Sequence, residues 1–183
     1  MKVLVLDIET NLKHDTIWCC VTQWAGDTGC LVHTESDHLQ AVIDQADVVV
    51  GHNIIGFDGP VLSRVWGIKI PLSKVRDTLV MSRLLNPQLE GGHSLRAWGE
   101  RLGDFKDDFS AFDDGLTQEM IDYCKQDVHV TSLLYDKLTK ELSSFGDSVE
   151  LEHKIAFIMK RQEDNGFKLD VPQAVALLAQ LKD

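Results

Sequence analysis

The apolar positions in the first part of the chain follow the short periods of β-strands. Val3–Glu9 opens with four consecutive apolar residues, a pattern typical of a strand that is buried on both faces. Two further strand-like runs, Ile17–Trp24 and Cys30–Thr34, follow across short polar loops and predict an antiparallel meander. The helical spacing of Asp37–Ala46 then leads directly into the buried run Val48–Gly51. This order of strand, helix and strand is typical of a parallel crossover.

Helical periods dominate the rest of the chain. The expected helices are Pro60–Trp66, Thr78–Leu85, Ser94–Arg101, Thr117 to about Leu142, Glu150–Asn165 and a last helix that starts near Asp170. Residues 103–115 are expected to form a polar loop, and Ser143–Ser148 a boundary between two parts of the chain. In the expected helix Glu150–Asn165, the residues expected to face inward are Leu151, Ile155, Ile158 and Met159. Together these elements predict an α/β fold in which helices cover a mixed sheet.

Two pairs of polar side chains in these elements each face one side. Asp7 and Glu9 lie two apart in the first strand, and Tyr123 and Asp127 lie four apart in the long helix. Either pair alone also fits ordinary solvated acids. Clustered acids repel, since two unit charges about 4 Å apart cost roughly 4 kcal/mol at an effective dielectric near 20. Hard divalent cations, which take oxygen ligands, remove this cost, so the pairs favour a site for Mg²⁺ or Mn²⁺.

A third segment, from Asn53 to Asp58, follows the buried run Val48–Gly51. Together with Asp7-Ile8-Glu9 and Tyr123-x3-Asp127, it resembles the three exonuclease motifs of the DEDD superfamily of 3′→5′ exonucleases, in the same order. The histidine branch of that superfamily places His five residues before the last Asp, where this chain has Asp122. The resemblance therefore indicates the tyrosine branch, DEDDy.

The resemblance extends to the exonuclease domain of family A DNA polymerases of the T-seven-like phage type, through Asp77–Leu84, His93–Gly99 and Lys106–Phe109. Residues 150–170 resemble the start of the polymerase domain of such enzymes, and the chain stops at Asp183. The resemblance implies a proofreading exonuclease domain over residues 1–145 and a truncated start of a polymerase domain over 146–183, without synthesis. The implied fold is ribonuclease-H-like, with a mixed five- or six-stranded sheet and helices on both faces.

The resemblance also implies a role for each site residue. Asp7 would bridge two ions of Mg²⁺ or Mn²⁺, with Glu9 and Asp127 completing the first site and Asp58 holding the second ion through water. In two-metal sites the ions stabilise the attacking and the leaving oxygens of the displacement. Tyr123 would orient the water, because a phenol with an unperturbed pKa of about 10 is a poor base at neutral pH. Single-stranded or mispaired 3′ ends of DNA would be trimmed to deoxynucleoside monophosphates.

Residues that flank the acids are candidates for contact with the terminal nucleotide, namely Thr10, Asn11, Leu12, Asn53 and Phe57. Leu12 or Phe57 would serve as an apolar wedge or a stacking platform, although simple core packing explains both equally well. None of His52, His93 and His129 falls in the catalytic position of the subtype. These histidines are therefore expected to be hydrogen-bonded structural groups.

The net charge of −11 has the wrong sign for a protein that coats nucleic acid by neutralising phosphates. A trimming nuclease tolerates this charge, because bound metal ions invert the local potential. We therefore expect the chain alone to bind DNA weakly. A polymerase domain of the same or a companion chain would provide most of the affinity for DNA.

The four cysteines show no paired metal-ligand spacing, so they are expected to be reduced and buried. No apolar stretch approaches the roughly 20 residues needed to span a bilayer. The expected location is the cytoplasm, which is that of a bacterial host if a phage encodes the protein.

Two other functional classes stay open. A stand-alone RNA-trimming 3′→5′ exonuclease would use the same acids, although the polymerase-like segment from Glu150 onward favours DNA. A non-catalytic nucleic-acid-binding module of the same fold is the second alternative. Such a module would be expected to lose some of the acids, whereas this chain retains all of them.

Overall fold

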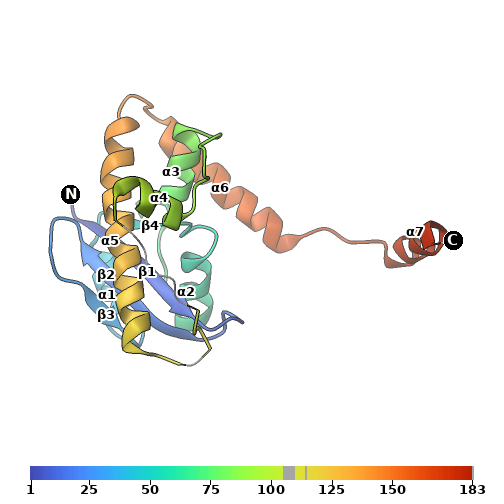
Figure 1. Cartoon of the computed structure of the whole chain (residues 1–183), viewed down its shortest axis with the longest axis horizontal. Helices are drawn as coiled ribbons and strands as arrows, with labels where there is room; N and C mark the ends of the chain where they lie inside the picture. The colour runs from blue at the N-terminus through green and yellow to red at the C-terminus, as the bar shows by residue number, and fades with distance from the viewer. Residues whose placement is uncertain (105–109, 114, 183) are drawn as a thin grey trace.

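A mixed five-stranded sheet forms the centre of the chain, whose computed structural model describes residues 1–104, 110–113 and 115–182 (Figure 1). Its strands are β1 (Val3–Thr10), β2 (Ile17–Trp24), β3 (Leu31–His33), β4 (Val48–Gly51) and β5 (Val75–Asp77), in the spatial order β3-β2-β1-β4-β5. The pairs β1/β2 and β2/β3 are antiparallel, whereas β1/β4 and β4/β5 are parallel. The meander and the parallel crossover are therefore both as predicted. The resemblance at Lys106–Phe109 and part of the expected loop lie outside the described residues.

Helices cover both faces of this sheet. The helices are α1 (Leu39–Gln45), α2 (Asp58–Trp66), α3 (Thr78–Leu85), α4 (Leu95–Leu102), α5 (Gln118–Glu141), α6 (Ser148–Asn165) and α7 (Val171–Lys182). Leu4, Leu6 and Ile8 of β1 pack in one core cluster with α1 and α2. Val5 packs in the other cluster, with α4 and α5. Because successive side chains of a strand alternate between its faces, Asp7 and Glu9 lie on the α5 side, as Val5 does.

Strand β1 is longer than the partner strand beside it. Its parallel pairing with β4 covers only Val3 to Val5, and β4 ends at Gly51. A Cβ atom at Gly51 would lie 2.8 Å from the Cβ of Ile54, so the turn that follows needs a glycine. The loop after Gly51 thus begins beside the second half of β1.

Buried Asp77 at the end of β5 holds this loop. Its carboxylate accepts hydrogen bonds from the backbone N–H groups of Asn53 at 2.9 Å and Ile55 at 3.0 Å. It also caps α3 by accepting from the N–H of Leu79 at 2.9 Å. Burial raises the pKa of Asp77, and these hydrogen bonds oppose that rise. The three-residue strand β5 was not predicted from the sequence.

Helix α6 packs through a different face from the one predicted. Leu151, Ile155, Ile158 and Met159 are exposed, with exposed fractions of 41–61%. The helix contacts α3 and β5, and its packed residues are Val149, His153 and Ala156. The helix therefore has two apolar stripes at helical spacing, and tertiary contacts select the one that contains His153.

His153 joins α6 to the sheet. The backbone N–H of Asp77 donates to Nε2 of His153 at 2.7 Å, and Nδ1 lies 2.6 Å from the carbonyl oxygen of Val149. Since Nε2 accepts a hydrogen bond, the proton of the neutral ring is on Nδ1. Burial lowers the pKa of His153, which favours this neutral form.

Helix α7 has no buried residue and stands apart from the rest of the chain, at the end of an extended segment (Figure 1). Helix α2 also differs from its prediction, since it begins at Asp58 rather than at Pro60. Within the described ranges, no helix is long and apolar enough to cross a membrane.

Replacing Asp77 by Ala should lower the free energy of unfolding by at least about 3 kcal/mol, because three backbone N–H groups lose their acceptor. Urea unfolding followed by circular dichroism measures this loss. Asp47→Ala is the matched control, since Asp47 accepts from the N–H of Lys2 at an exposed site and its loss should cost under about 1 kcal/mol. Equal losses in the two variants would contradict the role of Asp77.

Candidate active site

The second half of β1 directs two acids toward α5. Asp7 is half-buried and Glu9 is buried, and in the antiparallel register they stand opposite Val21 and Cys19 of β2. Side-chain oxygens of both acids and Sγ of Cys124 all lie within 4.8 Å of one another. The structure therefore brings the first predicted pair together and adds a thiol to it.

Asp58 enters the same region from the start of α2. Its side chain is 2% exposed and accepts a hydrogen bond from the backbone N–H of Ile8, which lies between Asp7 and Glu9 in β1. Burial raises the pKa of Asp58 to about 7, and the negative charges of Asp77 and Asp127 add to this rise. Asp58 thus lies near β1 through its hydrogen bond with Ile8, and close enough to Asp127 of α5 to interact with its charge.

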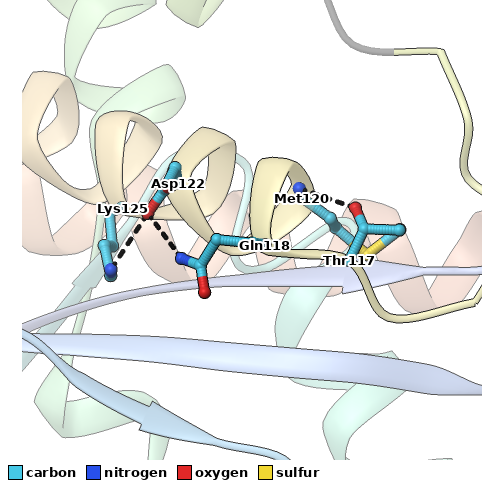
Figure 2. Close-up of polar contacts among 5 residues, drawn as sticks. All are labelled: Thr117, Gln118, Met120, Asp122 and Lys125. Atoms are coloured by element: carbon cyan, nitrogen blue, oxygen red, sulfur yellow. Dashed lines mark hydrogen bonds and ion pairs between the residues drawn. The ribbon is translucent and has the colours of Figure 1, made fainter.

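Helix α5 carries the remaining predicted residues. Its first turn is capped by Thr117, whose hydroxyl accepts from the N–H of Met120 at 3.1 Å (Figure 2). Asp127 is buried, and the half-buried ring of Tyr123 meets the ring of Phe112 edge to face, with the centroids 6.4 Å apart. The helix therefore buries Asp127 and leaves Tyr123 half-buried against Phe112.

Asp122, at the position where the histidine branch has its His, faces solvent. Its carboxylate accepts hydrogen bonds from Gln118 and Lys125, both at 3.0 Å (Figure 2). These two hydrogen bonds lower the pKa of Asp122. This acid is therefore engaged in a surface network on the helix, apart from the buried acids.

The donor set fits a hard divalent cation. The carboxylates of Asp7, Glu9, Asp58 and Asp127 are buried or half-buried, and burial, with a contribution from the charge of Asp127, raises the pKa of Asp58. Oxygen ligands of this kind suit Mg²⁺ or Mn²⁺. A bound cation would supply the counter-charge that the cluster needs.

Two of the predicted nucleotide-contact residues support a tight turn after β1. The hydroxyl of Thr10 lies 3.0 Å from the carbonyl oxygen of Asn11 and 3.0 Å from Nδ1 of His14. Asn11 accepts from the N–H groups of Asp15 and Thr16 and donates to the Asp15 carboxylate. In the described structure both side chains are engaged within this turn.

The other three candidates differ in how far they are exposed. Leu12 is 65% exposed, and its backbone N–H donates to Asp113 at 2.9 Å. Asn53 is exposed and adopts a left-handed conformation with φ of 64°. Phe57 is half-buried, and the ring of His14 meets its ring edge to face at 4.9 Å. Leu12 and Asn53 thus present surface to a ligand, whereas Phe57 is partly covered.

Sequence reasoning missed the position of Cys124 and treated the thiols only as reduced and buried. All four cysteines are free, and Cys30 is only half-buried. Cys124 lies three residues before Asp127, and this spacing could have placed it on the same helix face. Burial raises the pKa of Cys124 well above its usual value, helped by its hydrogen bond with Cys19 and by the charge of Asp7.

The histidines behave as expected, since each has a polar partner: His52 meets Thr78, His93 meets Ser82, and His129 meets Asp104. They take part in the packing of helices and loops around the site. None of them belongs to the cluster of candidate metal ligands among the described residues.

The five-stranded mixed sheet and the acids that converge on its central strand are the arrangement expected of a ribonuclease-H-like fold with a site for metal ions. A family model described as 3′-5′ exonuclease, of the DNA polymerase A type, matches residues 1–143. The chain belongs to this 3′-5′ exonuclease family, as the motifs predicted.

Among curated proteins, the chain is similar to the DNA-directed DNA polymerases of Escherichia phage T7 and Enterobacteria phage T3. It is 29% identical to each over 203 aligned positions, which cover 79% of this chain and 29% of the polymerase. The chain therefore spans less than a third of the length of these relatives.

Among solved structures, Brucella melitensis NrnC bound to pGG superimposes with a TM-score of 0.71 at 20% identity, covering 92% of this chain and 88% of that one. NrnC with bound Mg²⁺ gives a TM-score of 0.69 at 21% identity, with coverage of 92% and 89%. The catalytic core of Trypanosoma brucei RRP6 gives 0.64 at 17% identity, with coverage of 86% and 46%. These likenesses confirm the predicted fold.

The raised pKa of Asp58 predicts a pH-dependent stability of the metal-free chain. The folded state keeps the proton up to about pH 7, whereas the unfolded state releases it near 3.8. The folded state therefore binds more protons in this window, and the free energy of unfolding falls as the pH rises. Between pH 5 and 8 the contribution of Asp58 should fall by about 2–3 kcal/mol.

Urea unfolding at both pH values, in the presence of a chelator, measures this change. Asp58→Asn is the control, because its amide oxygen still accepts from Ile8 but does not titrate. The wild type should lose more stability than this variant between pH 5 and 8. Parallel pH profiles of the two proteins would contradict the assignment.

Proposed function

We propose that the chain is a two-metal 3′→5′ exodeoxyribonuclease, which removes nucleotides from single-stranded or mispaired 3′ ends as the proofreading part of a DNA polymerase. The observation that carries this proposal is the convergence of acids from β1, α2 and α5 at one end of the central strand. The 29% identity with two phage polymerases supports DNA as the substrate.

In this proposal Asp7, Glu9 and Asp127 hold one divalent ion, and Asp7 and Asp58 hold the second. The ions, when bound, supply Lewis acidity to the phosphodiester and its attacking water. Tyr123 orients the water and the terminal phosphate through its hydroxyl group. It acts as a positioning group and not as a base, because a phenol is protonated at neutral pH.

The terminal nucleotide would reach the acids past Leu12 and Asn53, which are exposed. The side chain of Leu12 would form an apolar contact with the last base. Phe57 would support the turn that carries Leu12, through its contact with the ring of His14. Thr10 and Asn11 would contribute by shaping the turn that carries Leu12.

We also propose that residues 1–145 form the exonuclease domain and that residues 146–183 begin a polymerase domain. Exposed apolar side chains on α6, on α7 and on the segment between them support this division, among them Leu151, Ile158, Leu169, Val175, Leu177 and Leu181. Runs of such side chains mark surfaces that another protein part covers. With a net charge of −11, the chain would rely on that part for most of its grip on DNA.

The test uses DNA and RNA strands of the same sequence, each labelled at the 5′ end, with Mg²⁺, with Mn²⁺ or with a chelator. The proposal expects DNA to be shortened from its 3′ end only when a metal is present, with deoxynucleoside monophosphates as products. A duplex with a mispaired 3′ end should be trimmed faster than a paired one. Faster trimming of RNA would favour the RNA-processing alternative, and binding without cleavage would favour a non-catalytic module.

Replacing Asp7 by Ala should lower the rate of DNA cleavage by at least about 100-fold, since the proposed metal site loses its shared ligand. The fold should survive, because removing one acid of a cluster relieves repulsion. Cleavage rates and circular dichroism spectra test both points. Asp122→Asn is the matched control, because this acid faces solvent on α5 and its loss should leave the rate unchanged. Full activity of the Asp7 variant would refute the assignment.

Tyr123→Phe should reduce the rate less than Asp127→Ala does, because it removes a positioning hydroxyl and leaves the proposed metal ligands in place. We expect about a 10-fold loss for the tyrosine variant, which is below the roughly 100-fold minimum typical of a lost general acid or base. Single-turnover cleavage of single-stranded DNA measures both rates. The opposite rank order would exclude the positioning role.

A further inference from the structure

The thiol of Cys124 touches the acid that the proposed function places between two metal ions. Its Sγ lies 3.5 Å from Oδ2 of Asp7 and 3.5 Å from the backbone carbonyl oxygen of the same residue. Both distances are within hydrogen-bonding range for a sulfur donor. The side chain is fully buried and belongs to the core cluster that contains Val5, Val21 and Val128. The sulfur therefore contacts Asp7 from the core side.

The thiol can act only as a donor toward Asp7, because both of its neighbours there are oxygen acceptors. A buried thiol in apolar surroundings keeps its proton. Cys19 of β2 also lies within hydrogen-bonding reach of Cys124 and is a competing acceptor for its proton. Of these acceptors the carboxylate oxygen of Asp7 is charged, so it is the strongest partner for the single proton of Cys124.

We propose that Cys124 is a positioning residue, whose thiol donates to Oδ2 of Asp7 and fixes the orientation of that carboxylate for metal binding. This inference rests on the proposed function, since it assigns Asp7 as a metal ligand. Carboxylates that bind metals are generally hydrogen-bonded in turn, and loss of such a partner weakens metal binding by roughly 10- to 100-fold.

Direct binding of a metal ion by the Cys124 sulfur is the competing interpretation. The thiol and the two acids lie close enough for a shared ion, with their ligand atoms within 4.8 Å of one another. However, the contact with the backbone oxygen of Asp7 places the sulfur beside the main chain of β1. Hard ions such as Mg²⁺ and Mn²⁺ also favour oxygen over sulfur. The geometry and the chemistry both favour the positioning role.

The test measures Mn²⁺ affinity by calorimetry for the wild type, Cys124→Ala, Cys124→Ser and Cys20→Ala. Cys124→Ala should bind Mn²⁺ about 10-fold more weakly or worse, and Cys124→Ser should recover most of the affinity because a hydroxyl also donates. Cys20→Ala removes an equally buried sulfur from the opposite core cluster, so it controls for the loss of packing. Its thermal midpoint should fall with that of Cys124→Ala, while its Mn²⁺ affinity stays at the wild-type value.

Cleavage rates provide a second readout for the same variants. In Cys124→Ala, raising the Mn²⁺ concentration should restore most of the cleavage rate, because the acids remain and only their affinity is reduced. A loss of rate that persists at saturating Mn²⁺ would overturn the proposal, as would equal Mn²⁺ affinity of Cys124→Ala and the wild type.

Co²⁺ separates positioning from direct binding by the thiol. A thiolate bound to Co²⁺ gives a strong charge-transfer absorption band in the near ultraviolet, which carboxylate ligands do not give. We expect no such band in the wild type. A band that disappears in Cys124→Ser would show direct binding and overturn the positioning role. A wild-type chain that binds no Mn²⁺ would instead overturn the proposed function, and this inference with it.

Discussion

The hydrogen bond between the N–H of Ile8 and the carboxylate of Asp58 is the interaction on which the site depends. Parallel pairing of β1 with β4 stops at Val5, so the rest of this edge of β1 needs other partners. Asp58 supplies one from the first residue of α2. The same contact brings the acid of α2 next to those of β1. A single side chain thus serves both this edge of β1 and the candidate active site.

Holding these acids close together is electrostatically unfavourable. The surrounding structure keeps them in place. Asp77 accepts hydrogen bonds from the backbone N–H groups of Asn53 and Ile55. These bonds fix the path of the chain into α2. Core clusters on both faces of the sheet hold β1 in place between α2 and α5. The acids therefore stay close together although burial and mutual repulsion raise the pKa of Asp58. A carboxyl group with a raised pKa inside a cluster of acids is typical of sites that bind a cation.

The sequence predicted the parts of this architecture that depend on local periodicity. The strand Ile17–Trp24 and the helix Thr78–Leu85 have the predicted bounds, and the period of two placed Asp7 and Glu9 on one face. The three-residue strand β5 was missed because so short a segment has no period. The packed face of α6 was also missed, because two apolar stripes compete on it and only tertiary contacts decide between them. The spacing within α5 could place Cys124 on the face of Asp127, but its contact with Asp7 also depends on how α5 is rotated against β1, which the sequence does not show.

The hydrogen bond from the N–H of Asp77 to His153 has a consequence for how the chain can be divided. The family match ends at residue 143, before α6 begins. Nevertheless, a fragment that ended there would leave a buried N–H group beside the loop of Asp58 without its acceptor, and would uncover the surface that α6 shields. The smallest piece that keeps this hydrogen-bond network intact extends through α6. A cut in the segment after Asn165 keeps this hydrogen bond, whereas a cut at the family boundary removes its acceptor; the polymerase-like segment proposed from residue 146 thus begins with a helix that packs on the exonuclease domain.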